Sequence, residues 1–147
     1  MNIDFLKELG MTKKTKEEIQ LVHPLVLAYL GDAVYEVFVR TYILHRHGGN
    51  VNVLHKLATK FVKAAAQAEI VHLLEPQLTE EEWGIIKKGR NQKSGTVPKN
   101  ANVGEYRYAT GFESLVGYLY LTEQNQRLER LIQLALDIIE KKEIGHE

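Results

Sequence analysis

The sequence has no cysteine among its 147 residues, so it forms no disulfide and offers no thiolate to a metal ion. It has only three prolines, which leaves long segments free to form helices. No stretch combines a basic start with an apolar run in the manner of a secretion signal. The longest apolar segment is interrupted by charged residues, which argues against a membrane span. These absences favour a protein of the cytoplasm.

Net charge is also absent, because 19 Lys and Arg side chains balance 19 Asp and Glu side chains. Any surface for nucleic acid must therefore be a local cluster of positive charge. The hydrophobic share of 44% and the charged share of 26% are those of an ordinary globular protein. A chain of this length has room for one substantial core, and we expect a single domain spanning residues 1–147.

Hydrophobic residues recur with helical spacing along nearly the whole chain, and no segment alternates convincingly with the period of a strand. The sequence therefore predicts an all-α fold. The longest predicted helix, Pro24 to His45, is apolar on almost every side, which is typical of a helix surrounded by others or lying in a subunit interface. Helices are expected over residues 5–9, 24–45, 51–74, 80–89, 105–121 and 126–141, with a charged connector over 11–18.

Two carboxylates, Asp32 and Glu36, interrupt the apolar central segment. Residues four apart share a helix face, so Ala28, Asp32 and Glu36 form one stripe. A buried Asp32 would be costly without a partner, and like charges repel unless a cation lies between them or one stays protonated. Mg²⁺ suits such a place, because it often uses only one or two protein carboxylates. Alternatively, Asp32 caps a neighbouring element or pairs with a buried Arg or Lys, and Glu36 is merely solvated.

A further carboxylate, Glu113, lies among apolar residues of the predicted helix 105–121. If this helix packs against the central one, Asp32 and Glu113 can face each other. Two acids from two helices make a better metal site than either acid alone.

Residues 89–104 form a long segment without a regular pattern, and such loops in compact domains are usually functional or disordered. The segment contains cations, amides, hydroxyls and glycines but no acid, which is the chemistry of phosphate and sugar contact. A solvated surface loop is the alternative. The residues of this loop and its approach that we expect to bind RNA are Lys88, Arg90, Asn91, Lys93, Ser94, Thr96, Lys99 and Asn100.

Two motifs carry a resemblance to a known family. The segment YLGDAVYE at 29–36 resembles the signature helix of the ribonuclease III catalytic domain, and ATGFESLVGYLYL at 109–121 resembles its second acidic motif. The size of the chain and the segment GRNQKSGTVPKNANVGEYRYATGFE are similar to the reduced branch of that family called Mini-III. The resemblance covers nearly the whole chain. It implies a helical catalytic domain with no separate double-stranded-RNA-binding domain.

By this resemblance Asp32 takes the place of the family's catalytic Asp, and Glu113 that of the second-motif Glu. Both are expected to bind Mg²⁺. Two of the family's four acidic positions differ, because Ala28 and Thr110 occupy them. The Mini-III branch shares this reduced set, so the resemblance does not imply a loss of activity. Glu36 continues the stripe of Asp32, and we hypothesise that it partly compensates.

The resemblance implies a Mg²⁺-dependent endoribonuclease that cleaves double-stranded RNA and leaves 5′-phosphate and 3′-hydroxyl ends. It further implies a substrate in the 23S ribosomal RNA precursor, with a ribosomal protein as a possible presenting partner. A homodimer with one active centre per subunit is also implied. Tyr29 occupies the position of the family's aromatic contact across the dimer interface.

Two rival functions remain open. One is an RNA-binding or ribosome-assembly module without catalysis, which the basic loop supports equally well. The other is a helical protein–protein interaction domain, which accounts for the apolar central helix but not for the loop. The acidic residues discriminate between these functions, because a pure RNA binder has no evident need for carboxylates near phosphates.

Overall fold

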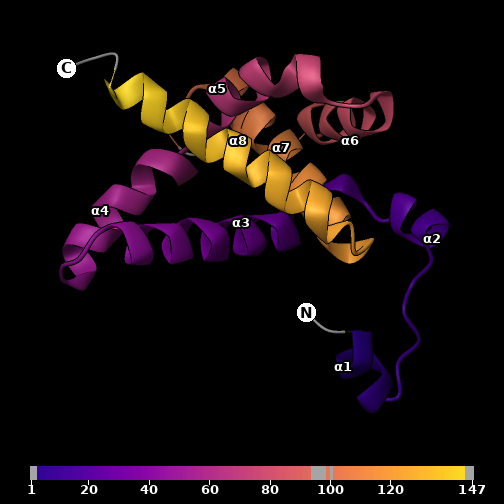
Figure 1. Ribbon diagram of the computed structural model, residues 1–147. Coiled ribbons are helices and arrows are strands. Elements are labelled where there is room, and N and C mark those ends of the chain that lie inside the picture. The colour runs from indigo at the N-terminus through magenta and orange to yellow at the C-terminus, as the bar shows by residue number, and fades with distance from the viewer. Residues whose placement is uncertain (1–2, 94–98, 100, 145–147) are drawn as a thin grey trace.

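The computed structural model describes residues 3–93, 99 and 101–144, and within these ranges all regular structure is helical, which confirms the all-α prediction (Figure 1). The described elements are α1 (Ile3–Glu8), α2 (Lys16–Gln20), α3 (Pro24–Arg46), α4 (Val51–Val62), α5 (Ala64–Leu74), the 3₁₀ turn η1 (Glu75–Gln77), α6 (Glu80–Arg90), α7 (Val103–Leu121) and α8 (Asn125–Ile144).

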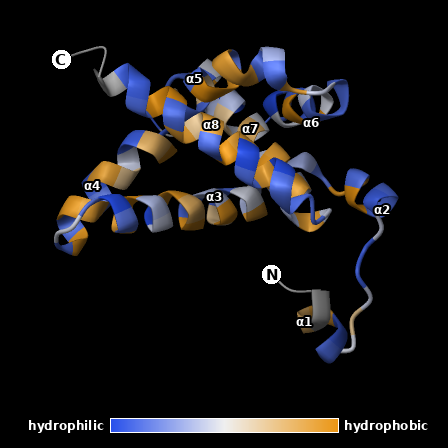
Figure 2. Cartoon of the chain, in the orientation of Figure 1, coloured by the Kyte–Doolittle hydropathy of each residue, from blue (hydrophilic) through white to orange (hydrophobic). Residues whose placement is uncertain are grey.

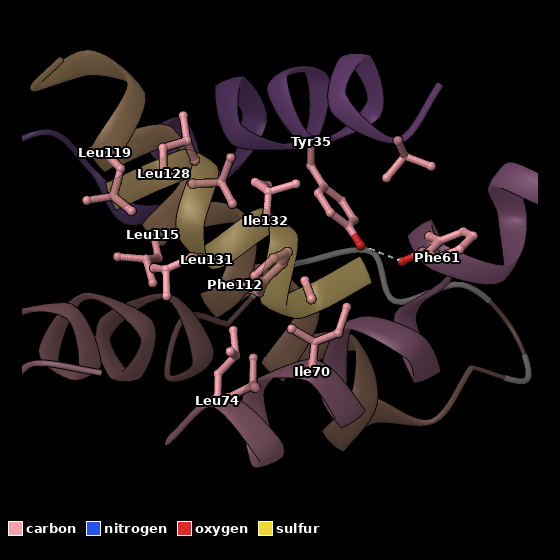
Figure 3. Close-up of a cluster of buried hydrophobic side chains, with 14 of the residues drawn as sticks. Tyr35, Phe61, Ile70, Leu74, Phe112, Leu115, Leu119, Leu128, Leu131 and Ile132 are labelled. Carbon is pink, nitrogen blue, oxygen red and sulfur yellow. Dashed lines mark hydrogen bonds between the residues drawn. The ribbon is translucent and has the colours of Figure 1, made fainter. Parts of the chain in front are cut away.

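Helix α7 lies at the centre of the fold and packs against α3, α5, α6 and α8. Ten of its residues are buried, because neighbouring helices cover it from several directions. Tyr35 of α3 meets Phe112 of α7 edge-to-face, with ring centroids 5.1 Å apart. Figure 3 shows these rings among the aliphatic side chains of α5 and α8 that complete the core. The central helix of the fold is thus α7, whereas the sequence analysis gave that place to α3.

The backbones of α3 and α7 touch where they cross. A Cβ atom on Gly31 would overlap the carbonyl oxygen of Glu113, and one on Gly117 would overlap the carbonyl oxygen of Leu27. Only glycine permits so close an approach of two helices. The crossing therefore fixes Gly31, and with it the next residue, Asp32, directly beside Glu113.

Local capping signals explain most helix starts. Thr79 and Glu82 form a capping box at the start of α6, and the side chain of Asn50 accepts a hydrogen bond from Val53 at the start of α4. A second capping box, between Thr15 and Glu18, opens α2. The predicted connector over residues 11–18 is therefore wrong at its end, because its last three residues are helical.

The helix predicted over residues 51–74 is broken in two. Lys63 separates α4 from α5 with extended backbone angles, φ −62° and ψ 152°. No proline or glycine marks this position in the sequence. The contacts that accommodate the break come from Tyr35 of α3 and from Gln67 of α5, and they lie next to the acidic residues described below.

Candidate active site

Asp32 and Glu113 lie together, as the sequence analysis expected if their helices packed. The crossing of α3 and α7 at Gly31 places the two carboxyl groups in hydrogen-bonding contact. The adjoining Glu36 is close enough for its charge to act on Glu113, and it also forms an ion pair with Arg40, Nε to Oε2, 2.8 Å. The structure therefore gathers acids from two helices into one site.

Glu113 is the less exposed member of this pair, because its side chain is half-buried, whereas Asp32 is exposed in the single chain. The expectation that Asp32 is buried is wrong, because the crossing leaves its side chain exposed at the surface, where it still contacts Glu113 of α7. Burial, followed by the hydrogen bond and the charge of Asp32, raises the pKa of Glu113 from 4.5 to about 9. The cost of burying a carboxylate thus falls mainly on Glu113.

Two buried side chains support this site from below. Gln67 of α5 forms a hydrogen bond with Glu113 that favours the charged carboxylate and lowers its pKa. Tyr35 of α3 is fully buried, and its hydroxyl donates to the carbonyl oxygen of Phe61 at 3.0 Å. Burial, together with the charges of Glu113 and Glu36, raises the pKa of the Tyr35 phenol above its usual range. The hydroxyl therefore keeps its proton and acts as a donor.

The chemistry of these donors fits Mg²⁺. Oxygen ligands from Asp32 and Glu113 are of the kind this ion prefers, and their proximity is unfavourable until a cation neutralises it. The described part of the chain contains no group of three or more His, Asp or Glu side chains arranged to hold a metal. Two protein carboxylates are nevertheless a usual share for Mg²⁺, whose remaining positions go to water and phosphate oxygens.

Ala28 and Thr110, which the resemblance places at two acidic positions of the family, are used for packing. Ala28 is buried within α3, with 7% of its surface exposed. The hydroxyl of Thr110 donates to the carbonyl oxygen of Tyr106 at 3.0 Å, inside its own helix. Neither residue offers an oxygen ligand that could replace the missing carboxylate.

Residues 89–104, which we call the basic segment, begin in contact with α7. Gly89, near the end of α6, packs on Gly111 and Ser114, so the segment starts beside the part of α7 that carries Glu113. Among the residues expected to bind RNA, the structure describes Lys88, Asn91, Lys93 and Lys99 as exposed. Three other predicted RNA contacts, Ser94, Thr96 and Asn100, lie outside the described residues.

Arg90 differs from the other cations of this segment because aromatic rings hold it. Its guanidinium carbon lies 5.5 Å from the ring centre of Tyr108 and 6.0 Å from that of Trp83. Its Nε atom donates to the side-chain oxygen of Asn91 at 3.2 Å. Helix α6 extends to Arg90, one residue beyond the predicted end, so this cation is fixed on a helix rather than in a loop.

Tyr29 belongs to an exposed apolar face of α3. Its exposed fraction is 82%, and Val26, Val37 and Leu44 along the same helix are exposed by 57%, 65% and 61%. Hydrophobic residues recur along the whole of α3 in Figure 2. Other helices thus cover only one face of α3, and the other face of the single chain is left without cover. The alternative in the sequence analysis, a subunit interface, stays a prediction for this second face.

Gln67 is the residue of this site that the sequence analysis missed. Its signal is weak, because it is a single polar residue within the alanine-rich segment AAAQA at 64–68. Periodicity places the segment in a helix but does not show which side chain meets Glu113.

Among the helices that the structure describes, none is long and apolar enough to cross a membrane.

Comparisons with known proteins agree with the motifs. Residues 25–124 match the model of the ribonuclease III domain family. A protein named Mini-ribonuclease 3 from Clostridium tetani is 48% identical over 86% of this chain and 85% of its own length. Its namesake from Enterococcus faecalis is 54% identical over 76% and 86% of the two chains. A crystal structure of a protein from Fusobacterium nucleatum aligns with a TM-score of 0.74 and 32% identity, covering 86% of this chain and 98% of that one.

Proposed function

Because the chain belongs to the ribonuclease III domain family, and to the group of relatives named Mini-ribonuclease 3, we propose that it is a Mg²⁺-dependent endoribonuclease of double-stranded RNA. Family membership supports the coarser statement that it is a ribonuclease acting on RNA. The finer statement rests on one observation, the contact between the carboxyl groups of Asp32 and Glu113 at the crossing of α3 and α7.

Each carboxylate has a distinct part in the proposed mechanism. Exposed Asp32 and half-buried Glu113 would hold the cation. When bound, Mg²⁺ supplies a hydroxide-like water and stabilises negative charge on the phosphate. Asp32 and Glu113 thereby orient the scissile phosphodiester, and the products carry 5′-phosphate and 3′-hydroxyl ends. Glu36 is paired with Arg40 and adds negative charge near Glu113. It remains a candidate to compensate in part for the two acidic residues of the family that this chain lacks.

RNA is held by the basic segment in this proposal. Lys88, Lys93 and Lys99 contact phosphates, and Arg90 approaches the RNA from its fixed position over Tyr108. Asn91 and the hydroxyl and amide side chains of Ser94, Thr96 and Asn100 contact sugars in the wide minor groove of the duplex. The electrostatic part of this binding weakens as salt concentration rises.

We also propose a homodimer joined through the exposed apolar face of α3, with Tyr29 contacting the partner subunit. A two-fold interface of this kind uses the same patch on both subunits. Two active centres would then cut the two strands of one duplex. The proposed substrate is the 23S ribosomal RNA precursor in the cytoplasm. A ribosomal protein presents this RNA where the free duplex alone is not cleaved.

The decisive experiment compares wild type with Asp32→Asn on a long RNA duplex in Mg²⁺, at protein concentrations adjusted to give equal RNA binding. We expect wild type to cleave and the variant to lose at least about a hundredfold in rate, because a neutral amide is a poor ligand for the cation. Binding is measured separately in Ca²⁺ by electrophoretic mobility shift.

The alternative is a non-catalytic RNA-binding module, and one observation favours it, namely the loss of two acidic positions to Ala28 and Thr110. If wild type and variant both bind the duplex and neither cleaves it at any Mg²⁺ concentration, the binding module becomes the better description. If only wild type cleaves, the alternative is excluded.

A further inference from the structure

Two side chains donate hydrogen bonds to carbonyl groups at the break between α4 and α5. Because Lys63 is extended, the carbonyl groups of Phe61 and Val62 lack their usual helical partners. The Tyr35 hydroxyl donates to the carbonyl of Phe61 at 3.0 Å, a contact drawn in Figure 3. The side-chain amide Nε2 of Gln67 donates to the carbonyl of Val62 at 2.8 Å.

These two side chains lie close to the two carboxylates. Tyr35 lies one turn after Asp32 on α3, and Gln67 forms a hydrogen bond with Glu113 of α7. Tyr35 and Gln67 are 0% and 2% exposed, so neither is free to move aside into solvent. The broken helix thus acts as a rigid support that contacts both acid-bearing helices from beneath.

Gln67 carries a cost that packing alone does not explain. Its Oε1 atom is shielded from solvent and has no hydrogen-bond partner, the one such buried side-chain atom in the part of the chain that the structure describes. A methionine has nearly the same shape and would fill this space without an unpaired oxygen. A polar side chain kept at such a cost is a candidate for a functional role.

We propose that Gln67 is a positioning residue that holds the Glu113 carboxylate toward Asp32 as a ready ligand for the divalent cation. Its amide Nε2 donates to the Val62 carbonyl at 2.8 Å, and the same side chain lies close enough to Glu113 to favour the charged carboxylate. Anchoring fixes the side chain in one rotamer, and the fixed rotamer fixes the orientation of Glu113. The inference rests on the proposed function, because it gives Glu113 a cation to bind.

The test is the affinity for Mn²⁺, measured by electron paramagnetic resonance on the full chain without RNA. Mn²⁺ accepts the same oxygen ligands as Mg²⁺ and gives a direct signal. We expect Gln67→Met to weaken Mn²⁺ binding by about ten- to a hundredfold, the usual effect of removing a support from a metal ligand. In cleavage assays the variant should need more Mg²⁺ for half-maximal rate, while its affinity for duplex RNA in Ca²⁺ stays that of wild type.

A matched control separates positioning from simple loss of stability. Tyr118→Phe also removes a hydrogen bond of a buried side chain, the one from the Tyr118 hydroxyl to Glu81 at 2.5 Å, on the part of α7 that contacts α2 and α6. We expect it to lower the unfolding temperature without changing Mn²⁺ affinity. If Gln67→Met behaves in the same way, with a lower unfolding temperature and unchanged Mn²⁺ affinity, the positioning role is refuted.

Glu113→Gln, measured alongside, distinguishes failure of this inference from failure of the proposed function. If Glu113→Gln loses Mn²⁺ binding while Gln67→Met retains it, only the role of Gln67 is wrong. If Glu113→Gln binds Mn²⁺ as wild type does, Glu113 is no ligand, and both proposals are overturned.

Discussion

At the scale of single residues, Glu113 carries the largest pH dependence of the candidate site. Burial first, then the hydrogen bond and charge of Asp32, raise its pKa from 4.5 to about 9. Between these two values the unfolded chain has released this proton while the folded, metal-free protein still holds it. Stability due to Glu113 is therefore complete below about pH 4.5 and is lost as the pH rises through about 9.

Glu113→Gln, which does not titrate, should remove this loss. Without metal, the unfolding temperature of wild type should fall more steeply between about pH 6 and about pH 9 than that of the variant. The variant should also be inactive in cleavage, which would make Glu113 a residue that favours function over stability. Calorimetry over this pH range is the measurement, with Glu129→Gln on the exposed surface of α8 as control. Equally steep curves for wild type and Glu113→Gln would assign the pH dependence to another group.

At the scale of elements, the site depends on the close crossing of α3 and α7. Gly31→Ala places a Cβ atom on the carbonyl oxygen of Glu113, and rigid backbone cannot yield to it. We expect a loss of at least about 2 kcal/mol in the free energy of unfolding, since overpacking usually costs about 1–3 kcal/mol and backbone yields least. Cleavage should fall as well, because α3 must move away from α7 and carry Asp32 with it.

A second glycine gives the matched control for this substitution. A Cβ atom on Gly84, inside α6, meets nothing within 4 Å. Gly84→Ala should therefore stabilise the protein by about 0.5–1 kcal/mol, the ordinary gain in a helix interior. Denaturant unfolding of the two variants measures the contrast. Similar effects from both substitutions would mean that the crossing is looser than described.

The same elements show which features could be predicted from the sequence. Helix ends marked by capping residues, such as Thr79 and Asn50, were predictable because the signal is local. The break at Lys63 was not, because one freed carbonyl is satisfied by Tyr35, which only the fold brings there, and the local contact of Gln67 with Val62 has no recognisable sequence signal. The meeting of Asp32 with Glu113 could be predicted from the motifs as conditional on helix packing.

Which of the two carboxylates is buried could not be read from the sequence. Both lie among apolar neighbours, and an apolar neighbourhood does not distinguish a face covered by the core from a face exposed on the surface. The exposure of Asp32 and the partial burial of Glu113 depend on the crossing of two helices far apart in the chain, where Gly31 meets the backbone of Glu113. Asp32 was therefore expected to be buried although it is exposed, whereas the meeting of the pair was correctly expected.

At the scale of the whole molecule, the uncovered face of α3 is too apolar for an isolated surface. Tyr29, Val37 and Leu44 are each more than half exposed along one helix. Aligned apolar side chains of this kind mark an interaction site more often than a solvated surface. A second copy of the chain is the proposed cover, because a two-fold axis would pair this face with itself and place two candidate sites on one assembly.

Tyr29→Ala should therefore weaken self-association by about tenfold or more, because large aromatic side chains at the centre of an interface contribute most of its binding free energy. Sedimentation velocity over a range of protein concentrations measures the effect. Leu21→Ala is the control, since Leu21 at the end of α2 is a similarly exposed apolar residue at 86% but lies off α3. Cleavage per chain should fall with the dimer fraction in Tyr29→Ala and stay unchanged in the control. A wild type that remains monomeric at every concentration, or two variants that associate alike, would refute the interface and leave the apolar face of α3 to another partner.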